Sequence, residues 1–216
     1  MEWNIMFENL FNEDNVVWRV IGVVGDIVML NIVFVFCCIP IITIGASVTA
    51  LYTVALKQVK YKSDFSIKLF FQAFRNNFKQ STIIWLIMLA VGALLVVDWY
   101  LANVAALSFA WILNYVFMFL GFCYLMILSY VFPIQSKFEN KISATIMNSA
   151  MMGVAHFLPW TLLIMLLNIL PFFMICITIN AHVVVVPIMF LGGFVIIAYI
   201  NSLMFQRFFI KYIPED

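Results

Sequence analysis

Long apolar runs alternate with short polar segments along most of the chain. Five of these runs exceed roughly 20 residues, the length that a helix rising about 1.5 Å per residue needs to cross about 30 Å of hydrocarbon. They cover approximately residues 20–44, 81–104, 107–133, 154–179 and 183–208. The pattern therefore predicts an all-α, polytopic transmembrane helical bundle of about five spans, organised as a single integral membrane domain over residues 1–216.

The connections between these runs indicate how neighbouring spans pair. Very short segments separate the second run from the third and the fourth from the fifth, so each pair is predicted to form an antiparallel helical hairpin. Pro159, Pro171 and Pro187 lie within or beside the last two runs. Because proline lacks a backbone N–H donor, we expect kinks near these positions.

The polar segment between the first two runs contains an amphipathic pattern. Its apolar positions follow the spacing of one helical face, and its basic positions lie off that stripe. The apolar set is Ile67, Phe70, Phe71, Phe74 and Phe78, and the basic set is Lys68, Arg75 and Lys79. We predict a helix over about residues 63–79 on the cytoplasmic side. It has two interpretations: an interfacial helix on anionic lipid, or a docking helix for a partner protein.

Composition supports a lipid environment. Hydrophobic residues make up 66% of the chain and charged residues 10%, and the mean hydropathy is +1.12. Soluble domains carry roughly 45–50% apolar and about 25% charged residues. A water-soluble fold of this length could not bury so much apolar surface, whereas a bilayer accepts it on the outside of the bundle. No basic stripe indicates a nucleic-acid partner.

The distribution of charge predicts the orientation of the chain. Ten of the eleven Lys and Arg residues lie between spans one and two, between spans three and four, or at the end of span five. With five spans these three regions share one side, which the positive-inside rule assigns to the cytoplasm. We therefore expect the amino terminus outside and the carboxyl terminus in the cytoplasm. Arg19, on the outer side of span one, does not fit this arrangement.

Residues with catalytic or metal-binding chemistry are sparse. The four cysteines lie inside apolar runs without ligand spacing, and His156 and His182 have no acidic or cysteine neighbours at such spacing. The sequence contains none of the common hydrolase, phosphate-loop or zinc motifs. It therefore predicts no catalytic residue, no metal site, no cofactor and no enzymatic activity.

Two acidic residues lie within predicted spans. Ionisable groups inside a bilayer are costly and often mark transport paths. Asp26 lies in the outer part of span one, and Asp98 lies towards the outer end of span two. Asp98 is a candidate contact for a solute or a proton. The structural alternative is that both carboxylates lie close to the outer headgroups, where their cost is small.

A proline–glycine element follows the first run. Pro40 interrupts regular helix geometry, and Gly45 has conformations closed to other residues. One interpretation is that the span ends here and a short helix over residues 47–57 follows. The other is a re-entrant turn, which is tolerated only where protein or a wet cavity surrounds it.

Several of these segments together resemble the YesL family of bacterial integral membrane proteins, a domain family of unknown function. The resemblance extends over nearly the whole chain, and the Pro40-x-x-Thr43-x-Gly45 element, preceded by Asn31, is its most specific part. The resembling stretches are residues 39–52, 70–82, 130–133, 136–138 and 199–202. The resemblance makes Asn31, Pro40, Thr43 and Gly45 candidate signature or structural residues, and it implies a bacterial cytoplasmic membrane.

The resemblance also implies a functional context, because family members look like accessory components of carbohydrate-utilisation systems, often beside sugar ABC importers and sensor kinases. We therefore expect a non-catalytic accessory subunit that binds an ABC sugar permease or a sensor kinase, with Phe70, Phe71, Phe74, Arg75, Phe78 and Lys79 as candidate docking residues for partner or lipid. One alternative is a small transporter or channel, acting alone or as a homo-oligomer, with a path near Asn31, Asp98 or Asn168. A second alternative is a membrane sensor that regulates sugar-utilisation genes.

Overall fold

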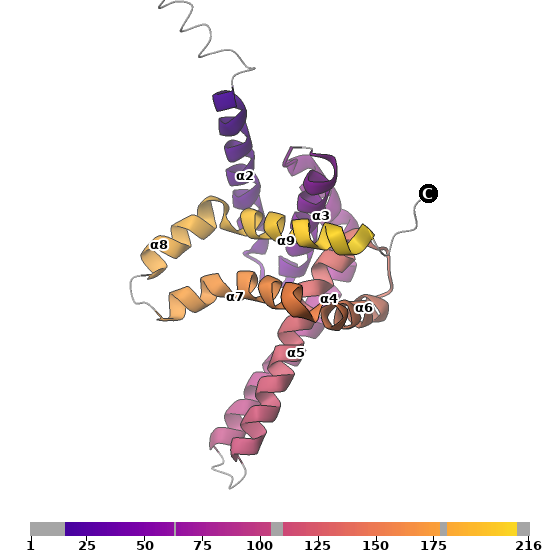
Figure 1. Cartoon of the computed structure of the whole chain (residues 1–216), viewed down its shortest axis with the longest axis vertical. Helices are drawn as coiled ribbons and strands as arrows, with labels where there is room; N and C mark the ends of the chain where they lie inside the picture. Colours follow the sequence, from indigo (N-terminus) through magenta and orange to yellow (C-terminus); the bar gives the residue numbers. More distant parts are fainter. Residues whose placement is uncertain (1–15, 63, 105–109, 178–180, 211–216) are drawn as a thin grey trace, which may run out of the picture.

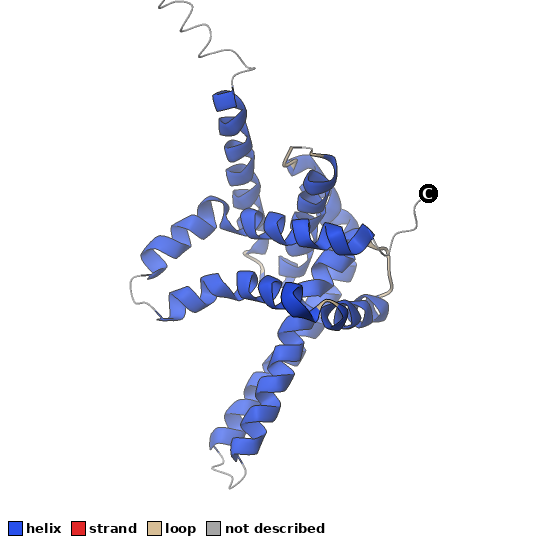
Figure 2. Ribbon diagram, viewed as in Figure 1, coloured by secondary structure: helices blue, strands red, loops and turns tan. Residues whose placement is uncertain are grey.

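The computed structural model describes residues 16–62, 64–104, 110–177 and 181–210, and every regular element in these ranges is helical (Figure 2). The helices are α2 (Val16–Cys38), α3 (Ile44–Tyr61), α4 (Ile67–Val104), α5 (Ala110–Lys137), α6 (Ile142–Ala155), α7 (Leu162–Ile177), α8 (Ala181–Ile188) and α9 (Phe194–Phe209). A 3₁₀ turn (Ile41–Thr43) and two π-helical segments (Phe157–Thr161 and Met189–Gly193) connect some of them. The chain is an all-α, multi-pass helical bundle, as predicted.

Five helical segments of the described residues are long and apolar enough to cross a membrane. They are Val20–Cys38, Ile41–Tyr61, Ile67–Val104, Trp111–Lys137 and Val183–Phe209. Four of them overlap predicted spans, and the segment that contains α3 is an additional one; the run predicted at residues 154–179 belongs to a bent helix pair, Ile142–Ala155 and Pro159–Ile169, which makes six candidate spans if the pair counts as one. The prediction of about five spans therefore holds, although the set of segments differs.

Helix α3 is the centre of the fold rather than a short connecting helix over residues 47–57. In its apolar window 56% of the residues are buried, against 17–22% in the other four candidate spans. It packs against α4, α5 and α9. Glycine, alanine and serine occupy the buried face at Gly45, Ala46, Ser47 and Ala50. Small side chains allow helix backbones to approach closely, and they also lower the hydropathy that would have marked α3 as a span.

Helix α4 unites two elements that the sequence predicted separately. The amphipathic helix expected over residues 63–79 and the span expected over residues 81–104 form one continuous helix of 38 residues. At 1.5 Å per residue this helix is roughly 57 Å long, about twice the thickness of a hydrocarbon core. Gln80, Ser81 and Thr82 are polar but do not break a helix, so the chain continues through them without interruption.

The run predicted as one span over residues 154–179 contains a sharp bend. The axes of Ile142–Ala155 and Pro159–Ile169 differ by 112°. Pro159 removes a backbone donor. The hydroxyl of Thr161 lies 3.0 Å from the carbonyl of Gly153 and 3.1 Å from that of His156, and it can donate to either. The phenol of Tyr130 lies 2.7 Å from the same hydroxyl. Buried polar side chains thus stabilise the bend.

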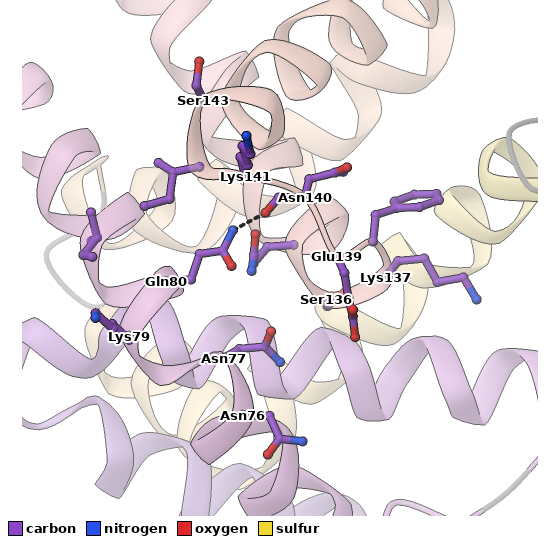
Figure 3. Close-up of a pocket in the computed structure, with 14 residues that line it drawn as sticks. Asn76, Asn77, Lys79, Gln80, Ser136, Lys137, Glu139, Asn140, Lys141 and Ser143 are labelled. Carbon is purple, nitrogen blue, oxygen red and sulfur yellow. Dashed lines mark hydrogen bonds between the residues drawn. The ribbon is translucent and has the colours of Figure 1, made fainter.

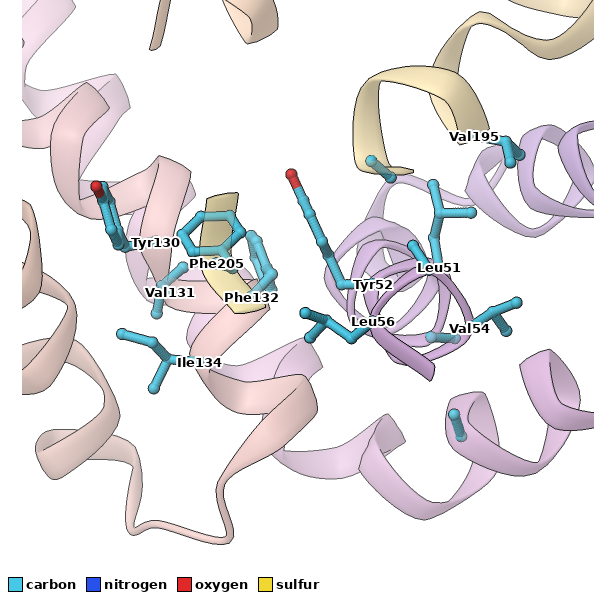
Figure 4. Close-up of a cluster of buried hydrophobic side chains, with 14 of the residues drawn as sticks. Leu51, Tyr52, Val54, Leu56, Tyr130, Val131, Phe132, Ile134, Val195 and Phe205 are labelled. Atoms are coloured by element: carbon cyan, nitrogen blue, oxygen red, sulfur yellow. The ribbon is translucent and has the colours of Figure 1, made fainter. Parts of the chain in front are cut away.

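A cluster of aromatic and branched side chains from α3, α5 and α9 forms the core (Figure 4). The ring of Phe205 lies edge-on to Tyr130, with centroids 5.2 Å apart, and edge-on to Tyr52, at 6.0 Å. Edge-to-face geometry at these separations is favourable for aromatic pairs. The core therefore joins the central helix to both the third and the last predicted spans.

Three helical arms extend from this core (Figure 1). The first half of α2 and the α4–α5 hairpin point towards opposite ends of the molecule, and the α7–α8 hairpin extends to one side. The arms carry exposed apolar side chains, including Val24, Leu94, Met118 and Val184. Such surfaces are stable against lipid chains, which agrees with a multi-pass membrane protein.

Candidate functional site

Asn31 connects α2 to the interruption between α8 and α9. Its side chain is fully buried, and its amide nitrogen donates to the carbonyls of Met189 (2.8 Å) and Phe190 (2.7 Å). Its amide oxygen accepts from the backbone N–H of Val195 (3.3 Å). The backbone departs from helical geometry at Gly192, so the carbonyls of the preceding turn need partners outside the helix. Asn31 therefore stabilises a break in the last span.

Pro40 and Thr43 form the turn between α2 and α3. The Thr43 hydroxyl lies 2.6 Å from the carbonyl of Cys37 and 2.7 Å from that of Pro40, and it can donate to either. The indole N–H of Trp85 donates to the carbonyl of Ile41 at 2.8 Å. Side chains thus supply partners for the carbonyls at the end of α2. The turn leads directly into α3, which begins at Ile44 and is longer than the expected helix over residues 47–57.

Gly45 is the point of closest approach between α3 and α4. A Cβ atom on this residue would lie 2.5 Å from the backbone oxygen of Ser81 and 2.6 Å from the Cβ of Trp85. One turn further along α3, the Thr49 hydroxyl donates to the Ser81 hydroxyl at 2.9 Å. A residue without a side chain is therefore required at position 45 by helix contact, not by an unusual backbone conformation.

The phenylalanines of the amphipathic segment do not form the single exposed face that the spacing predicted. Phe70 is completely buried, Phe74 is half-buried, and their rings stack at 6.2 Å. Phe71 and Phe78 remain exposed, and the exposed basic residues Lys68, Arg75 and Lys79 share their side of the helix. We call these five residues the α4 strip. The apolar stripe is wide enough that packing of α4 on the core buries one edge and leaves the other free.

A basic groove, which the sequence analysis did not identify, lies between α4 and the turn that joins α5 to α6 (Figure 3). Its volume is about 1060 Å³. Carboxamides and lysines dominate its lining, which consists of Asn76, Asn77, Lys79, Gln80, Ile83, Gln135, Ser136, Lys137, Phe138, Glu139, Asn140, Lys141, Ile142 and Ser143. The one sequence signal was the polar run from residue 135 to residue 143 between two apolar segments.

An inner cavity of about 320 Å³ lies among α3, α5, α7 and α9. Its lining is mainly apolar, with polar groups from Tyr52, Ser129 and Asn168. Behind this lining, the buried Asn201 amide lies 3.1 Å from both the Tyr52 hydroxyl and the Asn168 amide oxygen, to which it donates. Asn168, expected near a solute path, therefore lies at a cavity wall and also belongs to an interhelical hydrogen-bond network.

Comparison with known families identifies the region that carries the signature residues. Residues 27–99, about a third of the chain, match the model of a family described as a protein of unknown function, DUF624. This segment belongs to the DUF624 family. It is the same family as YesL, so the expected resemblance is confirmed over these residues. Neither the curated proteins nor the solved structures contain a match to the chain.

The DUF624 segment extends from the middle of α2 through α3 to Trp99 in α4. It contains all four candidate signature residues and the whole α4 strip. Asn31 and Thr43 make hydrogen bonds, and Gly45 makes a close contact, that explain the residue type at each position. Pro40 begins the turn between α2 and α3. The contacts therefore support a structural role for these four residues.

Asp26, Asp98 and His156 do not line the basic groove or the inner cavity. Asp98 is exposed near the far end of α4, and Asp26 is half-buried on α2. The His156 ring stacks on Phe208, with centroids 4.2 Å apart, whereas the side chain of His182 is outside the described set. Among the described residues, no group of three His, Cys, Asp or Glu side chains is arranged to hold a metal ion.

Proposed function

We propose that this DUF624 protein is a non-catalytic accessory subunit of a carbohydrate uptake system of the ABC type. In this proposal the α4 strip binds the membrane-protein partner. The observation that carries it is the pair of exposed phenylalanines, Phe71 and Phe78, flanked by three basic side chains on one side of α4. The carbohydrate context comes from the resemblance to the YesL family.

The composition of the α4 strip is typical of a docking surface. Aromatic residues and arginine are enriched at protein–protein interfaces and at the residues that contribute most to binding energy. The exposed fractions of Phe71 and Phe78 are 45% and 38%, so both rings are available to a partner. The opposite side of the helix is anchored by buried Phe70 and Ala73. A rigid presentation lowers the entropy cost of binding.

The length of α4 supports the same proposal. The helix is roughly 57 Å long, so roughly 27 Å of it exceeds the thickness of a hydrocarbon core of about 30 Å. Charged side chains are costly inside the bilayer, and the charges of α4 lie mainly between Lys68 and Lys79. The first part of α4 therefore extends beyond the hydrocarbon, where a neighbouring protein can reach the strip.

Site-specific crosslinking in native cells tests the docking role. A photo-reactive amino acid at position 71 or 78, followed by mild-detergent affinity purification and mass spectrometry, is expected to capture an ABC permease or its ATPase. The matched control is the same probe at Met147 or Met151 on α6, which are both 62% exposed. Equal capture of the same protein from these control positions would contradict docking at the α4 strip.

Substitution gives the corresponding loss of binding. Phe71→Ser combined with Phe78→Ser is expected to reduce recovery of the partner about tenfold or more, because interface aromatics often contribute over ~1 kcal/mol each. Expression should remain near normal since both rings are exposed. Phe70→Ser, at a fully buried position, is instead expected to lower the amount of folded protein. Undiminished association of the double variant would refute the proposal.

The inner cavity favours a second candidate function, passage of a small uncharged solute. Its wall contains the Asn168 amide and the Tyr52 hydroxyl within an otherwise apolar lining. If this candidate is correct, purified protein in liposomes moves solute, and Asn168→Ala changes the rate. Asp98→Asn, which alters an exposed residue outside the cavity, tests the other expected contact. Absence of flux above protein-free liposomes would eliminate this candidate.

A further inference from the structure

We propose that the basic groove binds a phosphate group, with Lys137, Lys141, Gln135 and the first backbone N–H groups of α6 as its donors. The groove shares Lys79 with the α4 strip, but the proposed donors lie outside the strip. It would give the protein a ligand in addition to any protein partner. Three features support this site: the charge of the groove, the unpaired amide nitrogen of Gln135 and the uncapped start of α6.

The groove has an excess of positive charge. Three lysines and one carboxylate, that of Glu139, line it, so its formal charge is +2. Figure 3 shows Lys79, Lys137 and Lys141 around a centre occupied by Asn77 and Gln80. Lysine ammonium groups only donate hydrogen bonds, and their flexible stems let them turn towards a bound anion. A concave surface of one charge sign also concentrates oppositely charged ligands.

Gln135 is a buried residue whose amide nitrogen the protein does not use as a donor. The residue is only 4% exposed and lines the groove. Its amide oxygen accepts from the Thr145 hydroxyl at 3.2 Å. Within the described part of the chain its amide nitrogen has no hydrogen-bond partner. The nitrogen itself is not fully buried, so an acceptor atom of a ligand in the groove can reach it.

The start of α6 opens into the same groove. Ile142 and Ser143, the first two residues of α6, belong to its lining, and Lys141 at the cap position makes no side-chain hydrogen bond to the helix. The first N–H groups of a helix lack intrahelical partners, and the helix dipole adds a partial positive charge. Helix starts with free N–H groups are common phosphate-binding positions.

These donors together indicate the chemistry of the ligand. The ammonium groups of Lys137 and Lys141, the Gln135 amide and the helix N–H groups require several acceptor oxygens on one small group, which a phosphate provides. The exposed carboxylate of Glu139 opposes this charge only in part. The groove, at about 1060 Å³, is far larger than a phosphate ion. The phosphate is therefore part of a larger molecule, either a lipid headgroup or a phosphorylated solute.

Binding to the purified full-length protein in neutral detergent tests the inference. Thermal unfolding would be followed during titration with dioctanoyl phosphatidylglycerol, with glycerol phosphate and with uncharged dioctanoylglycerol. The two phosphate compounds separate the possible sources: a shift of the unfolding temperature by the lipid alone supports a headgroup, and a shift by both supports a phosphorylated solute. A shift by dioctanoylglycerol as large as that by the lipid would overturn the proposal.

Charge substitutions locate the site. Lys137→Gln combined with Lys141→Gln is expected to weaken phosphate binding at least tenfold, since charge-assisted hydrogen bonds are among the strongest polar contacts. The matched control, Lys57→Gln with Lys60→Gln, removes the same charge from exposed positions on α3 outside the groove and should retain wild-type affinity. Three outcomes would each refute the site. The groove variant could bind as tightly as the wild type, both double variants could lose affinity equally, or no phosphate compound could produce a response.

Discussion

Asn31→Ala is expected to lower the free energy of unfolding by about 3 to 5 kcal/mol, because it removes partners from three backbone groups at once. The carbonyls of Met189 and Phe190 and the N–H of Val195 all bond to the Asn31 side chain, which is fully buried. An unpaired buried polar group costs about 1–3 kcal/mol. Unfolding of the purified protein in mixed micelles would measure the loss.

The control for this substitution is Asn103→Ala. Asn103 makes reciprocal hydrogen bonds with Asn114 at 3.0 and 3.2 Å, but the pair is exposed. Water can replace these bonds, so the change is expected to remain within about 0.5 kcal/mol. Asn31→Asp adds a second comparison: it removes both donated bonds and sets a carboxylate against two carbonyls, so it should destabilise at least as much as alanine. Similar losses for Asn31→Ala and Asn103→Ala would contradict the assigned role.

Gly45→Ala is expected to destabilise the fold by about 2–3 kcal/mol through overpacking. The new methyl group would lie 2.5 Å from the backbone oxygen of Ser81 and 2.6 Å from the Cβ of Trp85, neither of which can rotate away. Helix α3 must therefore move away from α4. This cost outweighs the gain of about 1 kcal/mol that alanine normally brings to a helix interior. The same unfolding measurement applies, and Gly45→Val should give little folded protein.

Two other helical glycines provide matched controls. A Cβ atom at Gly22 or Gly121 meets nothing within 4 Å. Alanine at either position is therefore expected to leave stability unchanged or to raise it by up to about 1 kcal/mol. If Gly45→Ala behaves like these controls, the close approach of α3 and α4 does not constrain this position.

Both substitutions probe the same structural unit. Asn31 and Gly45 lie in the DUF624 segment, and each contacts a different neighbour: the interruption at Met189–Gly193 in one case and α4 in the other. The α4 strip depends on this unit, because the position of α4 on α3 determines which phenylalanines are buried. We therefore expect changes at Gly45 to disturb the docking surface as well as stability.

The candidate signature residues illustrate what sequence reasoning could and could not reach. The resemblance singled out Asn31, Pro40, Thr43 and Gly45, and the local hydrogen bonds of Thr43 follow from its place after a proline. The partner of Asn31, in contrast, is 159 positions away at Phe190. The basic groove likewise brings residues 76–83 against residues 135–143. Neither pairing leaves a local pattern in the sequence.

The sequence alone determined that this is an all-α, multi-pass membrane protein with about five spans, because the length of each apolar run sets how many helices can cross a bilayer. It also determined that residues 67–79 are helical. Only the tertiary structure decided that α3 is central, that one edge of the phenylalanine stripe is buried, and that the run at residues 154–179 bends. In a chain that is apolar on nearly every helical face, hydrophobicity does not distinguish lipid from protein contact. Small residues, close backbone approach and buried hydrogen bonds determine which helical faces contact protein and which contact lipid.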